Sequence, residues 1–268
     1  MEITATHVGT ATVLLRIGEL TVLTDPVFDP AGSEYVVDIP ARGMSVPLWR
    51  TAGPAITAEE LPPIDLVLLS HDEHADNLDH TGRALLATAS TVITTKSGSG
   101  RLGGNAIGLA PWESHDVVCG KTRIKVTATP ARHGPEGIEP IMGDTIGFVV
   151  EVPGAQAALY ISGDTVYYDA LDEIGRRFGI GTALLHMGDA HFPAGGDIRF
   201  SMNGQAAAAL ARSLGARSVV PIHYESWAHL TEKPEEVTAA FDDAGLDGLL
   251  RWLDPGRPYP ITWPTLTV

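Results

Sequence analysis

The chain has 268 residues, of which 44% are hydrophobic and 19% are charged. This composition excludes wholesale disorder and predicts a globular protein with a large buried core. Acidic residues outnumber basic ones by 33 to 18, which gives a formal net charge of −15. Because no cluster of Lys and Arg interrupts this negative charge, nucleic acids and anionic membrane surfaces are poor candidate partners.

The cysteine content limits the kinds of site that the chain can build. Cys119 is the single cysteine, which excludes intramolecular disulfides and thiolate-rich metal sites, so a bound metal ion must use histidine and carboxylate. The amino terminus lacks the basic head and apolar run of a signal peptide, and no apolar stretch approaches the roughly 18 residues of a membrane span. We therefore expect a cytoplasmic protein without a membrane span.

Hydrophobic periodicity predicts strands in two sections, each followed by alternation of strands and helices. In chain order, it predicts strands at 12–17 and 20–24, an extended loop rich in Pro and Gly at 28–63, a buried strand at 64–70, a helix at 78–87, strands at 92–95, 117–119, 122–129, 145–152 and 158–162, a helix at 167–178, a strand at 183–187, a helix at 205–214, a strand at 218–222, a helix at 234–244 and a strand at 249–253. Asn203 is the expected N-cap of the third helix.

This order of elements predicts an α/β protein in which two sheets pack together with helices outside them. No linker, internal repeat or low-complexity tract divides the chain, so we expect a single domain over residues 1–268. The loop at 28–63 is long for a compact domain, and long loops of this kind are often functional. We expect it to lie over one face and to shape specificity.

The densest chemical feature is the sequence SHDEHADNLDH at 70–80, directly after the apolar run 64–70. Ligand sites in open sheets favour loops at the carboxyl ends of strands. Histidine and carboxylate together suit zinc, manganese or iron, because borderline and hard ligands are mixed and no thiolate is present. The competing interpretation is a solvated acidic loop that caps the next helix, and we favour the metal site over it.

Single ligand-type residues follow three later predicted strands. His133 comes after the strand that ends at 129, Asp164 after the strand around 158–161 and His223 after 219–222. Each is weak evidence alone, because a lone histidine at a strand end is usually structural and an Asp after Gly is usually a turn residue. Together with the loop at 70–80, these strand ends are expected to converge on one point.

The chain resembles the metallo-β-lactamase superfamily, particularly its ascorbate-lactonase-like and N-acylphosphatidylethanolamine phospholipase-D-like branch. The resemblance covers nearly the whole chain. It rests on HVGTATVL at 7–14, TDPVF at 24–28, SHDEHADNLD at 70–79, PARH at 130–133, ISGDT at 161–165 and PIHY at 221–224. It implies an αβ/βα four-layer sandwich of two mixed β-sheets flanked by helices, with a site for one or two metal ions at one edge.

The superfamily motif is usually His-x-His-x-Asp-His, and this sequence departs from it. His71 is the preferred first ligand and Asp72 the alternative, while Asn77 stands where the last histidine is expected. A neutral amide oxygen binds a divalent ion less well than imidazole, so a single-metal site stays open. The ligands that the resemblance implies are His71, His74 and His133 for the first ion, Asp164 as the bridge, and Asp76 with His223 for the second.

These residues predict a metal-dependent hydrolase that uses a metal-bound hydroxide. The lactonase-like resemblance implies that its substrate is a small-molecule ester, lactone or cyclic amide. Zn²⁺ is the expected cofactor, as one or two ions, with Mn²⁺ as the alternative. Asp76 is expected to orient the hydroxide and accept its proton, and His191 is the second candidate catalytic residue. The alternatives are a phosphodiesterase or phospholipase-D-like hydrolase and a non-catalytic protein with a degenerate metal site. A homo-oligomer is left open.

The remaining histidines receive structural interpretations. His186 lies inside an apolar run and is expected to be a hydrogen-bonded core residue. His7 is expected to support the site without binding the metal. His80, His115 and His229 are expected at the surface or at helix ends.

Overall fold

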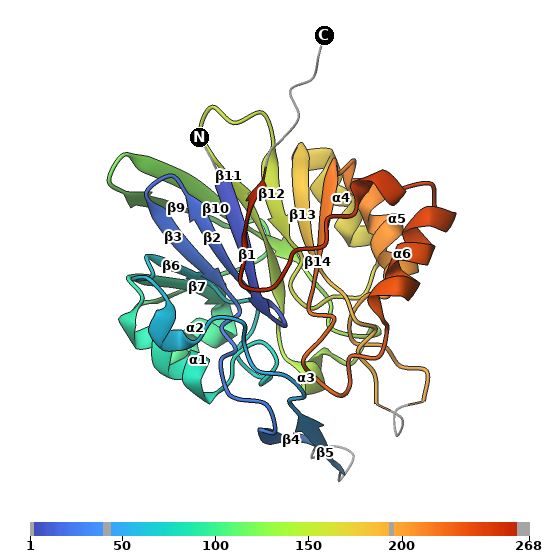
Figure 1. Cartoon of the computed structure of the whole chain (residues 1–268). Helices are drawn as coiled ribbons and strands as arrows, with labels where there is room; N and C mark the ends of the chain where they lie inside the picture. Colours follow the sequence, from blue (N-terminus) through green and yellow to red (C-terminus); the bar gives the residue numbers. More distant parts are fainter. Residues whose placement is uncertain (1–2, 40–43, 193–195, 262–268) are drawn as a thin grey trace.

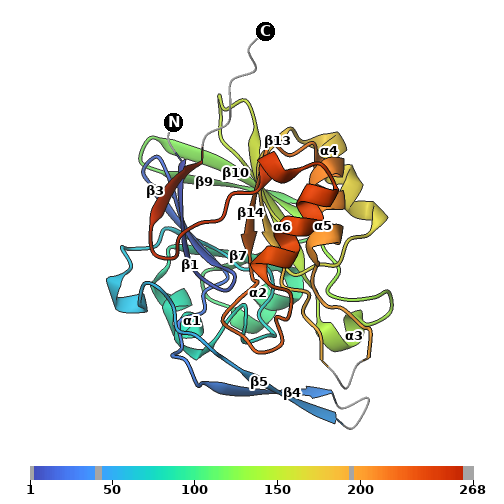
Figure 2. The ribbon, with the colours of Figure 1, turned by 45° about the vertical axis from the view of Figure 1, so that its right-hand side comes forward.

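The computed structural model describes residues 3–39, 44–192 and 196–261. Within this part of the chain, two large mixed sheets stack face to face and helices cover their outer faces (Figure 1). The αβ/βα sandwich expected from the sequence is confirmed. A smaller hairpin of β4 and β5 projects below the sandwich (Figures 1 and 2).

The first sheet orders its strands as β15, β1, β2, β3, β6, β7 and β8. Their bounds are Pro258–Ile261, Ile3–Gly9, Thr12–Ile17, Leu20–Thr24, Leu66–Leu68, Thr91–Thr95 and Ala106–Leu109. Pairing is antiparallel from β15 to β3 and parallel from β3 to β8. Since β6 is covered on both faces, its sequence is apolar throughout and all its residues are buried.

The second sheet orders its strands as β14, β13, β12, β11, β10 and β9. Their bounds are Ser218–Ile222, Ile180–His186, Ala158–Ile161, Ile146–Glu151, Thr122–Pro130 and Ser114–Cys119. Pairing is parallel from β14 to β12 and antiparallel from β12 to β9. The two sheets therefore each join an antiparallel half to a parallel half, and the parallel halves end in the site described below.

Helices complete the outer layers. On the first sheet lie α1 (His80–Leu85) and α2 (Lys96–Leu102), and on the second lie α4 (Asp172–Arg177), α5 (Gly204–Leu214) and α6 (Pro234–Asp243); α3 (Glu139–Met142) is a single short turn near the hairpin (Figure 1). Apolar side chains of both sheets, such as Leu15 and Phe148, fill the central layer. Among the described residues, no helix has the length and apolar character needed to cross a bilayer.

The segment 28–63 is more ordered than its weak periodicity predicts. It forms the antiparallel hairpin of β4 (Glu34–Ile39) and β5 (Met44–Trp49) and a short 3₁₀ turn at Ala58–Glu60. The expectation of a wholly extended loop was wrong, because Pro47 interrupts the strand signal although it faces outward on a two-stranded ribbon, where proline is tolerated.

The expected strand at 249–253 was also wrong. That segment makes only an isolated bridge between Leu250 and Val219, and a 3₁₀ turn at Asp247–Leu249 precedes it. The last strand is instead β15, which the sequence interpretation missed because it contains two prolines. It forms an edge of the first sheet beside β1, and an edge strand can accommodate residues that lack an N–H.

Asn203 is the N-cap of α5, as expected, and its side chain accepts a hydrogen bond from the Ala206 N–H. We expect Asn203→Ala to lower the free energy of unfolding by about 1 kcal/mol, because the Ala206 N–H loses its acceptor. Urea unfolding would measure the change. Asn203→Asp keeps an acceptor oxygen and should stay within a few tenths of a kcal/mol of the wild type; equal losses in both variants would contradict the capping role.

Candidate metal centre

The site lies where the parallel strands of both sheets end. His71 follows β6 in the first sheet, whereas Asp164 follows β12 and His223 follows β14 in the second. His133 comes from the loop after β10. Because parallel strands place their carboxyl ends at the same edge of a sheet, and the two sheets are stacked, these residues meet at one edge of the sandwich. The structure thus brings together the strand ends that the sequence singled out.

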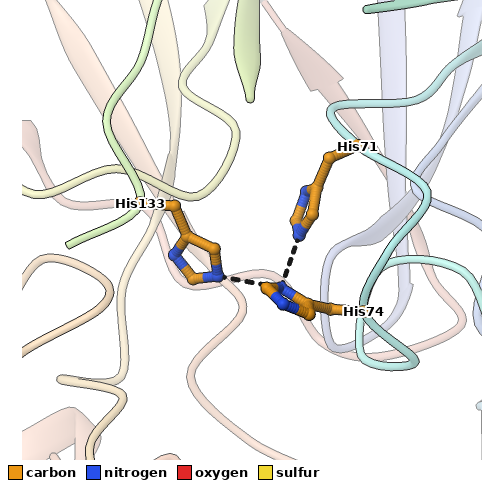
Figure 3. A group of neighbouring side chains, drawn as sticks. All are labelled: His71, His74 and His133. Carbon is orange, nitrogen blue, oxygen red and sulfur yellow. Dashed lines mark hydrogen bonds between the residues drawn. The ribbon is translucent and has the colours of Figure 1, made fainter. Parts of the chain in front are cut away.

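Three buried histidines form the first cluster, and their ring nitrogens face one another (Figure 3). The Nδ1 atom of His74 lies 2.9 Å from Nε2 of His71 and 3.0 Å from Nε2 of His133. A ring nitrogen carries one proton or one lone pair, so this arrangement does not satisfy all three rings by hydrogen bonds among themselves. Convergent imidazole nitrogens of this kind are typical of a transition-metal site.

Hydrogen bonds on the far side of two rings fix their orientation. His133 Nδ1 lies 2.6 Å from the carbonyl oxygen of Phe200 and must donate to it, so Nε2 is the ring nitrogen that faces the other histidines. His71 Nδ1 lies 2.9 Å from the Ser70 hydroxyl. Burial, together with the neighbouring rings, lowers the pKa of His71 well below its usual value and that of His74 to about 4. The rings of His71 and His74 are therefore neutral at pH 7 and able to bind a cation.

The second cluster contains Asp76, Asp164 and His223, all of them buried. The Nε2 atom of His223 lies 3.3 Å from Oδ2 of Asp76 and 3.7 Å from Oδ2 of Asp164. Burial alone would raise the pKa of both carboxyls, but the charge of the neighbouring histidines and, for Asp76, the hydrogen bond from His229 outweigh burial. They lower the pKa of Asp76 well below its usual range, and that of Asp164 to about 2. Burial by itself would lower the pKa of His223, but the two carboxylates outweigh burial and raise this pKa to about 9.

Asp164 belongs to the second cluster and also lies close to the first. Its Oδ2 atom lies 3.6 Å from Nε2 of His133 as well as near His223. Among the described residues, this buried oxygen and His223 Nε2 have no hydrogen-bond partner of acceptable geometry. Buried polar atoms normally have a hydrogen-bond partner. Buried polar atoms that lack one and lie beside other ligand-type atoms fit a site for divalent ions. The residues present therefore fit one ion at the histidines and a second beside Asp76.

The structure separates the two candidates for the first ligand. His71 belongs to the histidine cluster, whereas the carboxylate of Asp72 turns away and lies 3.0 and 3.1 Å from Nε of Arg101. Asn77 is buried and directs its side-chain N–H towards Asp164 Oδ1 at 3.4 Å. Asn77 stands at the position in the sequence where the family motif has its last histidine, and its amide contacts the carboxylate of Asp164.

His223 adopts a left-handed backbone conformation with a φ of 56°. Its N–H donates to the carbonyl oxygen of Thr10 at 2.6 Å, and His7 Nε2 lies 3.1 Å from the same oxygen. His7 thus supports the segment that positions His223, without belonging to either cluster. Positive φ values in non-glycine residues cost free energy and gather at functional sites.

His229 is the site residue that the sequence interpretation missed. It was expected near the surface, but its side chain is buried and its Nε2 atom lies 2.9 Å from Oδ2 of Asp76. Its ring stacks on Phe192, with centroids 5.3 Å apart. The only signal was its position six residues after His223, in the loop that follows β14.

The other histidines lie outside the two clusters. His191, the second candidate catalytic residue, is held by the Thr231 hydroxyl at 3.0 Å and the Asp189 carbonyl oxygen at 3.1 Å. His186 is a buried residue that contacts Asp25 at 3.0 Å, in agreement with its expected core role. The side chain of His80 is 84% exposed at the start of α1, as expected.

We expect His229→Phe to lower kcat about tenfold, because Asp76 loses a hydrogen bond while the ring contact with Phe192 is kept. The metal content should stay unchanged, since His229 is not one of the clustered ligands. Steady-state kinetics and elemental analysis of the purified variants would measure both. His229→Gln retains a donor and should recover part of the rate; equal losses in the Phe and Gln variants would argue against an orienting hydrogen bond.

An apolar pocket opens onto the metal centre. It has a volume of about 50 Å³. Its lining consists of Val37, Val46, Leu48, His74, Asp76, His133, Met142, Ala190, Phe192, Phe200 and His229. Side chains of both clusters therefore form its floor, and residues of the β4–β5 hairpin form part of its wall.

Comparison with known proteins identifies the family. The model of the β-lactamase superfamily domain matches residues 21–224. The chain belongs to the metallo-β-lactamase superfamily. Two relatives within it are both named UPF0173 metal-dependent hydrolase. One, from Pelotomaculum thermopropionicum, is 29% identical over 75% of this chain and 83% of its own length; the other, from Caldivirga maquilingensis, is 30% identical over the same shares.

Solved structures share the fold of this superfamily member at low identity. Isothiocyanate hydrolase from Delia radicum gut bacteria has a TM-score of 0.79 and 19% identity, and the match covers 96% of this chain and 98% of that chain. Igni18, a metallo hydrolase from Ignicoccus hospitalis, has a TM-score of 0.73 and 19% identity over 98% of this chain and 100% of that chain. Identities this low support the metallo-β-lactamase fold alone.

Proposed function

We propose that the chain is a metal-dependent hydrolase that cleaves an ester, a lactone or a cyclic amide of a small molecule. The observation that carries this proposal is the pair of adjoining buried clusters, His71, His74 and His133 beside Asp76, Asp164 and His223. They share one edge of the sandwich with the apolar pocket. The names of the sequence relatives support metal-dependent hydrolysis.

The donor set indicates which ions the clusters would hold. The histidine cluster would bind the first ion, Asp76 with His223 would bind the second, and Asp164 would help to hold both. Imidazole and carboxylate suit Zn²⁺ best here, with Mn²⁺ as the alternative. When bound there, a divalent ion would lower the pKa of water towards about 7 and would polarise the carbonyl oxygen of the substrate.

The chain's own residues supply orientation and proton transfer. Asp76 Oδ2 faces the pocket floor between His223 and His229, so it can orient a water molecule and take up its proton. The hydrogen bond from His229 fixes the carboxylate in this position. Phe192 and Phe200 contact each other and line the same pocket with apolar surface, which limits the access of bulk water.

Metal analysis and a substrate panel would test the proposed function. Elemental analysis after gentle purification should find bound divalent metal, chelation should abolish hydrolysis, and added Zn²⁺ or Mn²⁺ should restore it. The panel should contain esters, lactones, cyclic amides, an isothiocyanate and a phosphodiester. Faster cleavage of the phosphodiester would replace the proposed substrate class, and a protein that neither contains nor takes up metal would overturn the enzyme proposal.

A further inference from the structure

The pocket beside the metal centre has two chemically distinct parts. Its polar atoms come from site residues, namely His74, Asp76, His133 and His229. Each of the other lining residues is apolar: Val37, Val46, Leu48, Met142, Ala190, Phe192 and Phe200. A substrate would therefore place its reacting group on the polar floor and the rest of its atoms against an apolar wall.

The β4–β5 hairpin supplies this wall through one of its faces. The cross-strand pair of Val37 and Val46 lines the pocket, and the neighbouring pair of Val36 and Pro47 lies on the opposite face. Val36 is 63% exposed, whereas the pocket-facing valines are half-buried. The alternation of a strand thus separates pocket residues from surface residues one position apart.

Contacts at the base of the hairpin hold this face over the site. Leu48 is buried and packs with Val27 and Trp227. Arg50 forms a β-bridge with Trp227, two residues before His229. The hairpin and His229 of the polar floor are therefore both connected to the loop that follows β14.

The charges around the pocket disfavour an anionic substrate tail. No Lys or Arg lines it within the described ranges 3–39, 44–192 and 196–261. Two arginines that do not line the pocket form ion pairs: Arg199 Nε lies 3.0 Å from Asp189, although its Nη1 atom has no hydrogen-bond partner among the described residues, and Arg50 lies 3.1 Å from Asp79. A carboxylate or phosphate placed against the wall would lose its hydration without gaining a partner, which is costly.

We propose that this hydrolase selects neutral substrates that carry a short apolar group, and that the hairpin face of Val37 and Val46 makes the selection. The inference rests on the proposed function and narrows its substrate class. Metal ions would attract the reacting carbonyl oxygen, but they do not compensate an anionic group seated against the apolar wall. The overall charge of −15 acts in the same direction, because it repels anions approaching the site.

A matched pair of esters tests the selection directly. 4-Nitrophenyl butyrate and 4-nitrophenyl hydrogen succinate share the scissile bond and similar chain length, but only the succinate carries a carboxylate at neutral pH. With the Zn²⁺-loaded enzyme we expect kcat/KM for the butyrate to exceed that for the succinate by about 100-fold or more, after correction for spontaneous hydrolysis. A ratio near one, or a preference for the succinate, would overturn the inference.

Two variants on opposite faces of the hairpin test the role assigned to it. Val46→Lys places a cation in the wall and should lower the butyrate preference at least tenfold, whereas Val36→Lys adds the same charge on the outer face and should leave the ratio unchanged. Val37→Lys provides a second pocket-facing variant if Val46→Lys fails to fold. Equal effects of the inner and outer lysines would reduce the result to a long-range charge effect and contradict the assignment.

Binding separates this inference from the proposed function. Butanohydroxamate and its succinate counterpart, a hydroxamate with a terminal carboxylate, can be titrated calorimetrically into the Zn²⁺-loaded protein without any turnover. We expect butanohydroxamate to bind at least tenfold more tightly, and Val46→Lys to reduce that difference. If this preference holds but no ester is cleaved, the selection stands and the hydrolase proposal fails. If both esters are cleaved equally and both hydroxamates bind equally, the selection alone fails.

Discussion

Asp76→Asn is expected to lower kcat by about 10³-fold while the protein remains folded. The carboxylate belongs to the second ligand cluster and also faces the pocket floor, so the amide removes both an anionic ligand and a proton acceptor. General acid–base catalysis alone accounts for about 10²- to 10⁴-fold in rate. Steady-state kinetics with the metal-supplemented variant would measure the loss, and circular dichroism would verify the fold.

Asp72→Asn is the matched control, because Asp72 lies in the same loop and is equally buried. Its carboxylate contacts Arg101 instead of the clusters. Its kcat should remain within about threefold of the wild type, since the ligand set is intact. A variant of Asp76 with wild-type turnover and metal content would refute the assigned role, as would a loss in Asp72→Asn comparable to that in Asp76→Asn.

Arg50→Ala is expected to lower the free energy of unfolding by about 3 to 5 kcal/mol. Arg50 is only 1% exposed, and its guanidinium lies 3.1 Å from Asp79, which caps α1. Burial raises the pKa of Asp79 and lowers that of Arg50, so each charge depends on the other for stabilisation. Removing one partner of such a pair leaves an uncompensated buried charge. Urea unfolding would measure the change.

The exposed pair of Arg257 and Asp254 provides the comparison. Their atoms are 3.8 Å apart and both side chains are about four-fifths exposed. Arg257→Ala should therefore change stability by no more than about 0.5 kcal/mol. Similar losses in the two arginine variants would contradict the importance of the buried pair.

Much of the fold follows from local patterns in the sequence. Strands such as β2 and β3 were predicted at their observed bounds, because apolar runs ended at clear turn signals. The hairpin of β4 and β5 was missed because its strands gain order from the contacts of Leu48 and Arg50 with a distant loop. Strand β15 was missed because pairing with β1 at an edge overrides the low strand propensity of proline.

The candidate site could also be predicted only in part from the sequence. Residues at strand ends were recognisable, since His133, Asp164 and His223 each follow an apolar run and belong to a known pattern. His229 was not, because nothing in its local sequence shows that the loop after β14 folds back onto Asp76. The choice between His71 and Asp72 likewise depended on Arg101, a residue of α2 that lies close only in the folded chain.

The candidate ligands come from both halves of the sandwich. His71, His74 and Asp76 follow β6 in the first sheet, whereas His133, Asp164 and His223 belong to the second. A bound ion would link the two sheets, much as a disulfide links two segments of a chain. By thermodynamic linkage, whatever pulls the sheets apart also weakens the hold on the ion. A destabilising substitution of a central-layer residue such as Phe148, which is remote in sequence from the candidate ligands, would then lower the metal content of the protein.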